Sequence, residues 1–178
     1  LRHLRDPRLI AVVRAAAQRA NWDTRPSPRS VNSRTGRATG RGLSCVFYEG
    51  DNGSCSIVAV VEVDQGTGAV EVRKLTIAND CGPISNPDGL RNQLEGGLIQ
   101  SASWTLKEQV NFDENGIVSR DWESYPILTF AEVPEIETIL IDHQDCPFLG
   151  SGEATQGPTA AAIGNAIFDS VGLRLRRI

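Results

Sequence analysis

The sequence predicts an α+β fold, in which small antiparallel sheets pack against helices. Segments rich in β-branched residues follow one another in blocks, and segments with apolar residues at helical spacing stand apart from them. Strands and helices do not alternate singly, as they would in a parallel βαβ fold. With 178 residues, 40% of them apolar, the chain can bury one sizeable core or two small ones.

The first expected element is an amphipathic helix that begins behind Asp6-Pro7 and runs to about Asn21, because aspartate caps helices and proline favours their first turn. Its apolar residues are Leu9, Ile10, Val12, Val13, Ala16, Ala17 and Ala20. From Asp23 to Gly42 the composition is Pro, Ser, Arg, Thr and Gly without periodicity, which predicts a linker or mobile loop. We therefore divide the chain into an amino-terminal helix with a basic linker, residues 1–41, and a carboxy-terminal domain, residues 42–178.

Three segments rich in β-branched residues are expected to form a small antiparallel sheet. They are Leu43–Glu49, Ser56–Asp64 and Ala69–Ala78. The last two are joined by Gln65-Gly66-Thr67-Gly68, a composition typical of a hairpin turn.

A second helix is expected to begin at Asn86-Pro87 and to continue to about Gln109. Gly96 and Gly97 interrupt it, and each glycine inside a helix costs roughly 1 kcal/mol relative to alanine. Their presence indicates that another backbone or a ligand comes close to the helix at this point.

A second hairpin, another strand and a final helix complete the expected elements. Val110–Phe112 and Ile117–Val118 flank an acidic turn, which is too short for a calcium loop. Ile136–Asp142 is the strand. The final helix is expected to run from Pro158 to a stop at Gly172. We expect its apolar residues Ala160, Ile163 and Ile167 to meet a neighbouring part of a larger protein.

Charge is distributed unevenly along the chain. The net charge is -4, yet the first 41 residues contain ten arginines against Asp6 and Asp23, a balance of +8. Clustered arginines are typical of nucleic-acid binding, but no aromatic residue lies between Trp22 and Phe47. A solvated linker against an acidic neighbouring surface is favoured, and nucleic-acid binding is kept as an alternative.

The four cysteines contain no C-x-x-C pair, so we expect buried thiols and no zinc site or iron–sulfur cluster within this chain. They are Cys45, Cys55, Cys81 and Cys146. His3 and His143 are expected to be surface or loop residues. No apolar run approaches the roughly 20 residues of a membrane span. Both ends read as cuts through a longer polypeptide, so the compartment is not predicted.

One carboxylate, Glu153, lies in the glycine-rich segment Gly150–Pro158 directly before the final helix. Glycines let backbone N–H groups converge on a ligand, and a helix amino terminus adds partial positive charge. The carboxylate is therefore expected to stay ionised and available as a base. Pro-Thr follows Gly157, which excludes a nucleotide-binding P-loop. The residues alone leave a capping and a catalytic role equally open.

Three motifs in register resemble the last part of the molybdenum-binding subunit of the xanthine dehydrogenase/aldehyde oxidoreductase family. They are Asn79-Asp80-Cys81-Gly82-Pro83-Ile84-Ser85-Asn86-Pro87, Gln93-Leu94-Glu95-Gly96-Gly97, and Gly150–Pro158 followed by Ala162–Phe168. Tyr125-Pro126-Ile127 and Val133–Glu137 extend the likeness, which covers the chain from about Gly40 to Ile178. The ending looks closest to the bacterial isoquinoline or nicotinate oxidoreductase branch.

The resemblance implies that residues 42–178 are part of a molybdopterin-binding lobe in a subunit that hydroxylates an N-heterocycle or an aldehyde with oxygen from water. Glu153 matches the family's general base. The implied cofactor contacts are Gln93, Gly96, Gly97, Gly152 and Ala154, and no direct metal ligand is implied. The cofactor is molybdenum–molybdopterin, as the pterin alone or in a dinucleotide form, shared with the rest of the subunit.

The partners that the resemblance implies are an iron–sulfur subunit or domain, the remainder of the molybdenum-binding subunit and a small-molecule substrate. Two departures from the family pattern concern substrate specificity and pterin contacts: Ala154-Thr155-Gln156-Gly157 replaces a proline-containing stretch, and Ser101 and Ser103 stand where glycines are common. An alternative interpretation is a folding and assembly module without activity of its own.

Overall fold

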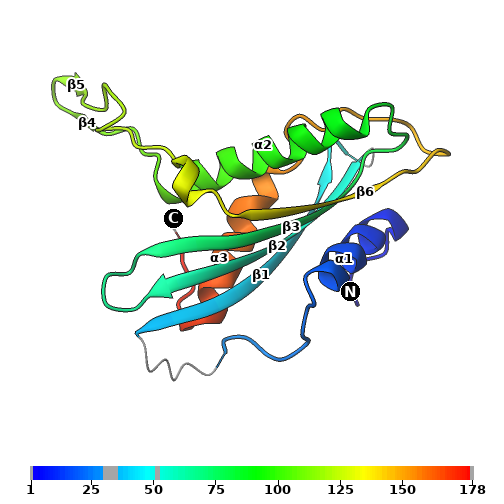
Figure 1. Cartoon of the computed structure of the whole chain (residues 1–178), viewed down its shortest axis with the longest axis horizontal. Helices are drawn as coiled ribbons and strands as arrows, with labels where there is room; N and C mark the ends of the chain where they lie inside the picture. Colours follow the sequence, from blue (N-terminus) through cyan, green and yellow to red (C-terminus); the bar gives the residue numbers. More distant parts are fainter. Residues whose placement is uncertain (1, 30–35, 51–52, 177–178) are drawn as a thin grey trace.

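The computed structural model describes residues 2–29, 36–50 and 53–176. Within these residues a four-stranded sheet is covered by helix α1 on one face and by helices α2 and α3 on the other (Figure 1). The strands, in spatial order, are β1 (Arg37–Tyr48), β2 (Gly53–Asp64), β3 (Val70–Asp80) and β6 (Glu135–Ile141). The α+β class is confirmed. The sheet is not purely antiparallel, because β6 pairs with β3 in parallel after the chain has crossed over through α2.

The predicted linker is too long, because β1 begins at Arg37 and pairs with β2 from that residue on. The reason lies in Gly40 and Gly42, which read as loop residues in the sequence. A Cβ added at Gly40 would overlap the backbone of Ala166, and one at Gly42 would overlap that of Ala162. These glycines therefore let helix α3 lie directly on the strand. The boundary predicted between residues 41 and 42 falls inside β1.

Helix α1 (Pro7–Arg19) begins where the sequence predicts, and it ends before the expected Asn21. The Asp6 carboxylate accepts a hydrogen bond from the Leu9 backbone at 2.8 Å, which satisfies one of the free N–H groups of the first turn. The buried cluster that joins α1 to the sheet consists of Leu9, Val12, Ala16, Val58 and Ala78. Burial of this helix face, more than helix propensity, holds α1 in place.

Helices α2 (Pro87–Leu106) and α3 (Gln156–Val171) pack together on the other face of the sheet. Asn86 caps α2 as predicted, and Gly172 ends α3 with a φ of 74°. Ile163 and Ile167 are 0% and 3% exposed and fill this chain's own core. For these two residues the expectation that they meet a neighbouring part of a larger protein is therefore wrong, whereas Ala160 is half-buried.

The second hairpin is confirmed as β4 (Phe112–Asp113) and β5 (Gly116–Ile117), and it projects beyond the end of α2 (Figure 1). A short 3-10 helix, η1 (Phe130–Glu132), leads back toward β6. The base of the projection is fixed where Ser103 Oγ accepts the Leu128 N–H at 3.0 Å.

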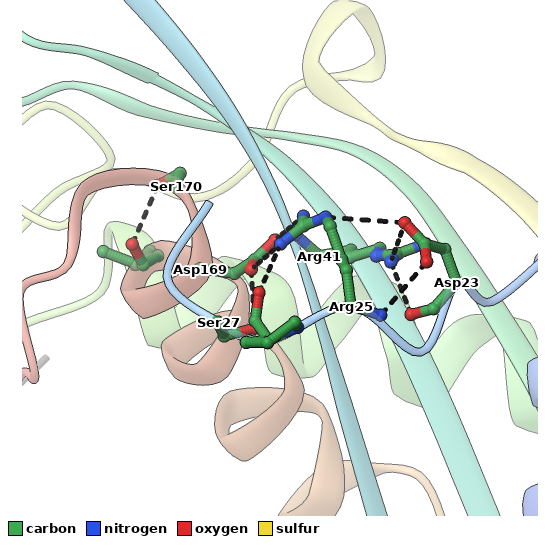
Figure 2. A network of polar contacts seen from close by, with 8 residues as sticks. Asp23, Arg25, Ser27, Arg41, Asp169 and Ser170 are labelled. Atoms are coloured by element: carbon green, nitrogen blue, oxygen red, sulfur yellow. Dashed lines mark hydrogen bonds and ion pairs between the residues drawn. The ribbon is translucent and has the colours of Figure 1, made fainter. Parts of the chain in front are cut away.

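The basic segment, expected to be a linker or mobile loop, is held against α3 over residues 25–29 (Figure 2). The Arg25 guanidinium donates to both oxygens of Asp169 at 2.8 and 2.7 Å, and Ser27 Oγ donates to the same carboxylate at 2.6 Å. Burial alone would raise the pKa of Asp169, but hydrogen bonds from Arg25, Ser27 and the Arg41 amide outweigh it and hold the pKa at about 2. Arg41 in turn lies over the Trp22 ring and pairs with Asp23.

No helix among the described residues is long and apolar enough to span a membrane. The four cysteines are free thiols, of which Cys55 and Cys81 are buried as expected, whereas Cys45 and Cys146 are only half-buried.

Candidate active site

Glu153 lies in the loop between β6 and α3, one turn before the helix, and is exposed. Its carbonyl oxygen accepts the Gln156 N–H at 3.1 Å, so the loop leads directly into the first turn of α3. Tyr48, at the end of β1, is half-buried and lies close to Glu153. Burial and the negative charge of Glu153 raise the pKa of Tyr48 above its ordinary value. The sequence did not point to Tyr48, which is far from Glu153 along the chain.

The loop that carries Glu153 is seated on the turn that follows β3. The Leu149 N–H donates to the Cys81 carbonyl at 2.8 Å, and Ser151 Oγ donates to Asn79 Oδ1 at 3.3 Å. Gly82 has a φ of 80°, and a Cβ at this position would overlap the backbone carbonyl of the proline at position 147. The motif of residues 79–87 and the motif of residues 150–158 therefore contact each other in the fold.

A buried carboxylate, Asp80, ends β3 directly before this turn. It is 0% exposed and accepts hydrogen bonds from Arg8 Nε at 3.0 Å and Arg8 Nη2 at 2.7 Å, from His143 Nδ1 at 2.6 Å and from the Gly82 N–H at 3.1 Å. Burial alone would raise the pKa of Asp80, but the bonds from Arg8, His143 and Gly82 outweigh it and lower the pKa. His143 lies in a loop as predicted, and its partner Asp80 was not foreseen from the sequence.

The α2 motif faces the same loop. A Cβ added at Gly152 would lie 3.6 Å from Gln93 Nε2, so the amide of Gln93 is next to the residue that precedes Glu153. Gly96 lies one turn further along the helix, is exposed, and would accept a side chain without any contact within 4 Å. Gln93, Gly96, Gly152 and Glu153 are all exposed in this region.

Gly97 and Ala154 are placed differently from the other predicted cofactor residues, because both are buried. A Cβ at Gly97 would overlap Thr155 Oγ1, so this glycine accommodates the chain's own loop. Thr155 is 1% exposed, and its Oγ1 has no hydrogen-bond partner among the described residues. The two glycines of α2 thus differ, since Gly97 is required by internal packing and only Gly96 faces open space.

The two serines that replace common glycines bind neighbouring backbone. Ser101 Oγ donates to the Gln156 carbonyl at 2.7 Å and accepts the Trp104 Nε1–H at 3.1 Å. Ser103 holds the segment that leads to η1, as described above. The Gln156 side chain also donates to Gln100 Oε1 at 2.9 Å. These bonds tie α2 to the start of α3 and hold the Glu153 loop between them.

Apart from the Glu153 carboxylate, the predicted site residues that are exposed offer neutral hydrogen-bonding groups. Gln93 offers an amide, Gly96 and Gly152 offer backbone that no side chain covers, and the amino terminus of α3 favours negative charge nearby. Within the described residues, no group of three or more His, Cys, Asp or Glu side chains could hold a metal ion.

A family model described as a molybdopterin cofactor-binding domain matches residues 51–134. One of the subunits of nicotinate dehydrogenase from Pseudomonas putida is 42% identical over all of this chain, which covers 16% of that protein. The beta subunit of isoquinoline 1-oxidoreductase from Brevundimonas diminuta is 30% identical over all of this chain, which covers 22% of it. The crystal structure of quinoline 2-oxidoreductase from Pseudomonas putida matches 67% of this chain with a TM-score of 0.63 and 29% identity, over 16% of that chain.

Proposed function

Because this chain belongs to the molybdenum-binding subunits of the xanthine dehydrogenase family, we propose that it supplies one side of the active site of a molybdenum hydroxylase. The observation that carries the proposal is the convergence of three motifs, in which the loop of Glu153 contacts both the turn after β3 and Gln93 of α2. The chain spans 16% and 22% of the two curated relatives, so the proposed enzyme is larger than this chain.

The proposed substrate is a small molecule with an electron-poor carbon, in an N-heterocycle or an aldehyde. An N-heterocycle is favoured, because two relatives that match the whole chain are named for nicotinate and isoquinoline. Hydroxylation of such a carbon requires a nucleophilic oxygen and an acceptor for two electrons. The molybdenum–molybdopterin cofactor supplies both when it is bound.

In this proposal the chain's own residues bind the cofactor on one side and move a proton. Gln93 donates or accepts a hydrogen bond through its amide, and Gly96 and Gly152 let the pterin of the cofactor approach the backbone. Gly97 and Ala154 contribute from beneath, through packing and backbone only, since both are buried. Mass spectrometry of the released cofactor will distinguish the pterin alone from a dinucleotide form.

Glu153 is proposed as the general base. Glu153 is exposed just before the amino terminus of α3. From there it would accept the proton of the water-derived oxygen as that oxygen attacks the substrate carbon. Electrons would then pass to an iron–sulfur subunit or domain, which is a proposed partner together with the remainder of the molybdenum-binding subunit.

The test is Glu153→Gln in the complete enzyme. We expect full molybdenum and pterin content and a loss of turnover of roughly 10²–10⁴-fold, as is typical for removal of a general base. Asp145→Asn is the matched control, because Asp145 is exposed on the same loop and loses the same charge. Near-normal kcat for Glu153→Gln at full cofactor content would show that Glu153 is not the base.

The alternative of an assembly module without catalytic residues predicts the opposite result for the same variant, namely unchanged turnover. The nucleic-acid alternative loses support from the fold, because Arg25 and Arg41 of the basic segment bind Asp169 and Asp23.

A further inference from the structure

We infer that Asp80 and His143 are positioning residues that hold the loop of residues 142–155, and with it Glu153, in its working place. The inference rests on the proposed function, because it concerns the placement of the proposed base. Asp80 is buried and His143 binds Asp80, so each would act through the loop and not on the substrate.

Asp80 collects its hydrogen bonds from three separate segments. Arg8 belongs to α1, Gly82 to the turn after β3, and His143 to the start of the loop after β6. Each oxygen of the carboxylate has two partners: Oδ1 accepts from Arg8 Nη2 and the Gly82 N–H, and Oδ2 accepts from Arg8 Nε and His143 Nδ1. Moving any one segment would therefore leave a buried charge with fewer partners, which is costly.

The same turn anchors the loop at later points along its length. Cys81 accepts the Leu149 N–H, Asn79 binds Ser151, and Gly82 packs against the backbone near position 147. The contacts of His143, Leu149 and Ser151 thus follow one another along the loop and end two residues before Glu153. Because Asp80 binds the Gly82 amide, it holds the shape of the turn through which Cys81 and Gly82 contact the loop.

A buried ion pair is weak evidence for stability, since apolar residues of similar volume often serve a core as well or better. What a buried ion pair provides is a fixed geometry, because a carboxylate that accepts from four donors tolerates little displacement of any of them. At Asp80 this fixed geometry links the sheet, α1 and the loop of Glu153.

The chain offers a matched control for this arrangement. Asp169 is also buried, at 1% exposed, and is also bound by both ends of an arginine guanidinium, that of Arg25. It lies near the carboxy-terminal end of α3, whereas Glu153 precedes the amino-terminal end. Asp169→Asn therefore removes a comparable charge without touching the loop.

The experiment compares Asp80→Asn, His143→Ala and Asp169→Asn in the complete cofactor-loaded enzyme, with hydrogen exchange of the Leu149 amide and steady-state kinetics as readouts. For Asp80→Asn we expect exchange to rise about tenfold or more, and kcat to fall about 10- to 100-fold with KM changed far less. His143→Ala should change both in the same direction, and His143→Asn, which keeps a donor near Nδ1, should restore them. Asp169→Asn should leave both readouts near wild type.

Wild-type protection of Leu149 in both Asp80→Asn and His143→Ala would overturn the inference. If Asp80→Asn does not fold, His143→Ala decides alone, because the His143 side chain is 42% exposed and its loss leaves the Arg8 contacts in place. An active Glu153→Gln enzyme would refute the proposed base, while the exchange comparison would still decide whether Asp80 and His143 hold the loop.

Discussion

The contact between Gly97 and Thr155 gives a prediction whose size can be worked out from the structure. A Cβ at Gly97 would overlap Thr155 Oγ1 and would lie 3.6 Å from Thr155 Cβ. Gly97→Ala therefore requires that the Thr155 side chain rotates or that the start of α3 moves away from α2. Gly96→Ala is the matched control, because nothing lies within 4 Å of the added methyl group.

Alanine gains about 1 kcal/mol over glycine inside a helix, so Gly96→Ala should stabilise the protein by about that amount. At Gly97 the same gain is opposed by overpacking, which typically costs about 1–3 kcal/mol. The expected net effect there is a destabilisation of about 0–2 kcal/mol. The two variants should therefore differ by about 1–3 kcal/mol.

The assay is denaturant unfolding of the variants, together with the double mutant Gly97→Ala/Thr155→Ala. Thr155→Ala removes the overlapping oxygen, which has no hydrogen-bond partner among the described residues, so the alanine at position 97 should then be accommodated. We expect a favourable coupling of about 1–3 kcal/mol in this cycle. Equal unfolding midpoints for Gly96→Ala and Gly97→Ala, with additive effects in the cycle, would refute the packing role of Gly97.

Two further predictions concern ionisable groups. The pKa of Asp169 is lowered from its ordinary value of 3.8 to about 2. The ionised carboxylate and its bond to Arg25 therefore stabilise the fold fully at pH values above 3.8, and this stabilisation is lost as the pH falls toward 2. Arg25→Ala should lower the unfolding midpoint at pH 7 and flatten its dependence between pH 4 and pH 2, and a wild-type profile would contradict this. Tyr48→Phe removes the phenolic hydroxyl beside Glu153, and a hydroxyl that hydrogen-bonds in the working site contributes about 0.5–1.5 kcal/mol. The variant should lower kcat/KM by up to about tenfold with cofactor content unchanged. An unchanged kcat/KM would show that Tyr48 does not contribute to the site.

Elements with strong local signals could be predicted from the sequence. Asn86-Pro87 starts α2 and Gly172 ends α3 because capping chemistry acts within a few residues. The same holds for the hairpin turn after Asp64, whose carboxylate accepts the Gly66 and Thr67 N–H groups at 2.9 Å. Of the predicted site residues, the structure brings Gln93, Gly152 and Glu153 together on an exposed face.

The errors arose where a distant partner decides the role of a residue. Gly40 and Gly42 read as loop because their function, the close approach of α3, depends on a helix at the other end of the chain. Arg25 reads as a solvated linker residue until Asp169 is placed beside it. No motif in the sequence around His143 indicates that its side chain binds Asp80. The parallel addition of β6 depends on the path of the chain through α2 and not on the β6 residues themselves.

The central claim, that Glu153 acts as the base, is tested most directly by a single turnover of the cofactor-loaded enzyme. The measurement is the rate at which excess N-heterocyclic substrate reduces Glu153→Gln, compared with wild type and Asp145→Asn at equal molybdenum and pterin content. If Glu153 is the base in the chemical step, this rate falls by roughly 10²–10⁴-fold in Glu153→Gln and stays near wild type in Asp145→Asn. A Glu153→Gln enzyme that is reduced as fast as wild type would contradict the claim.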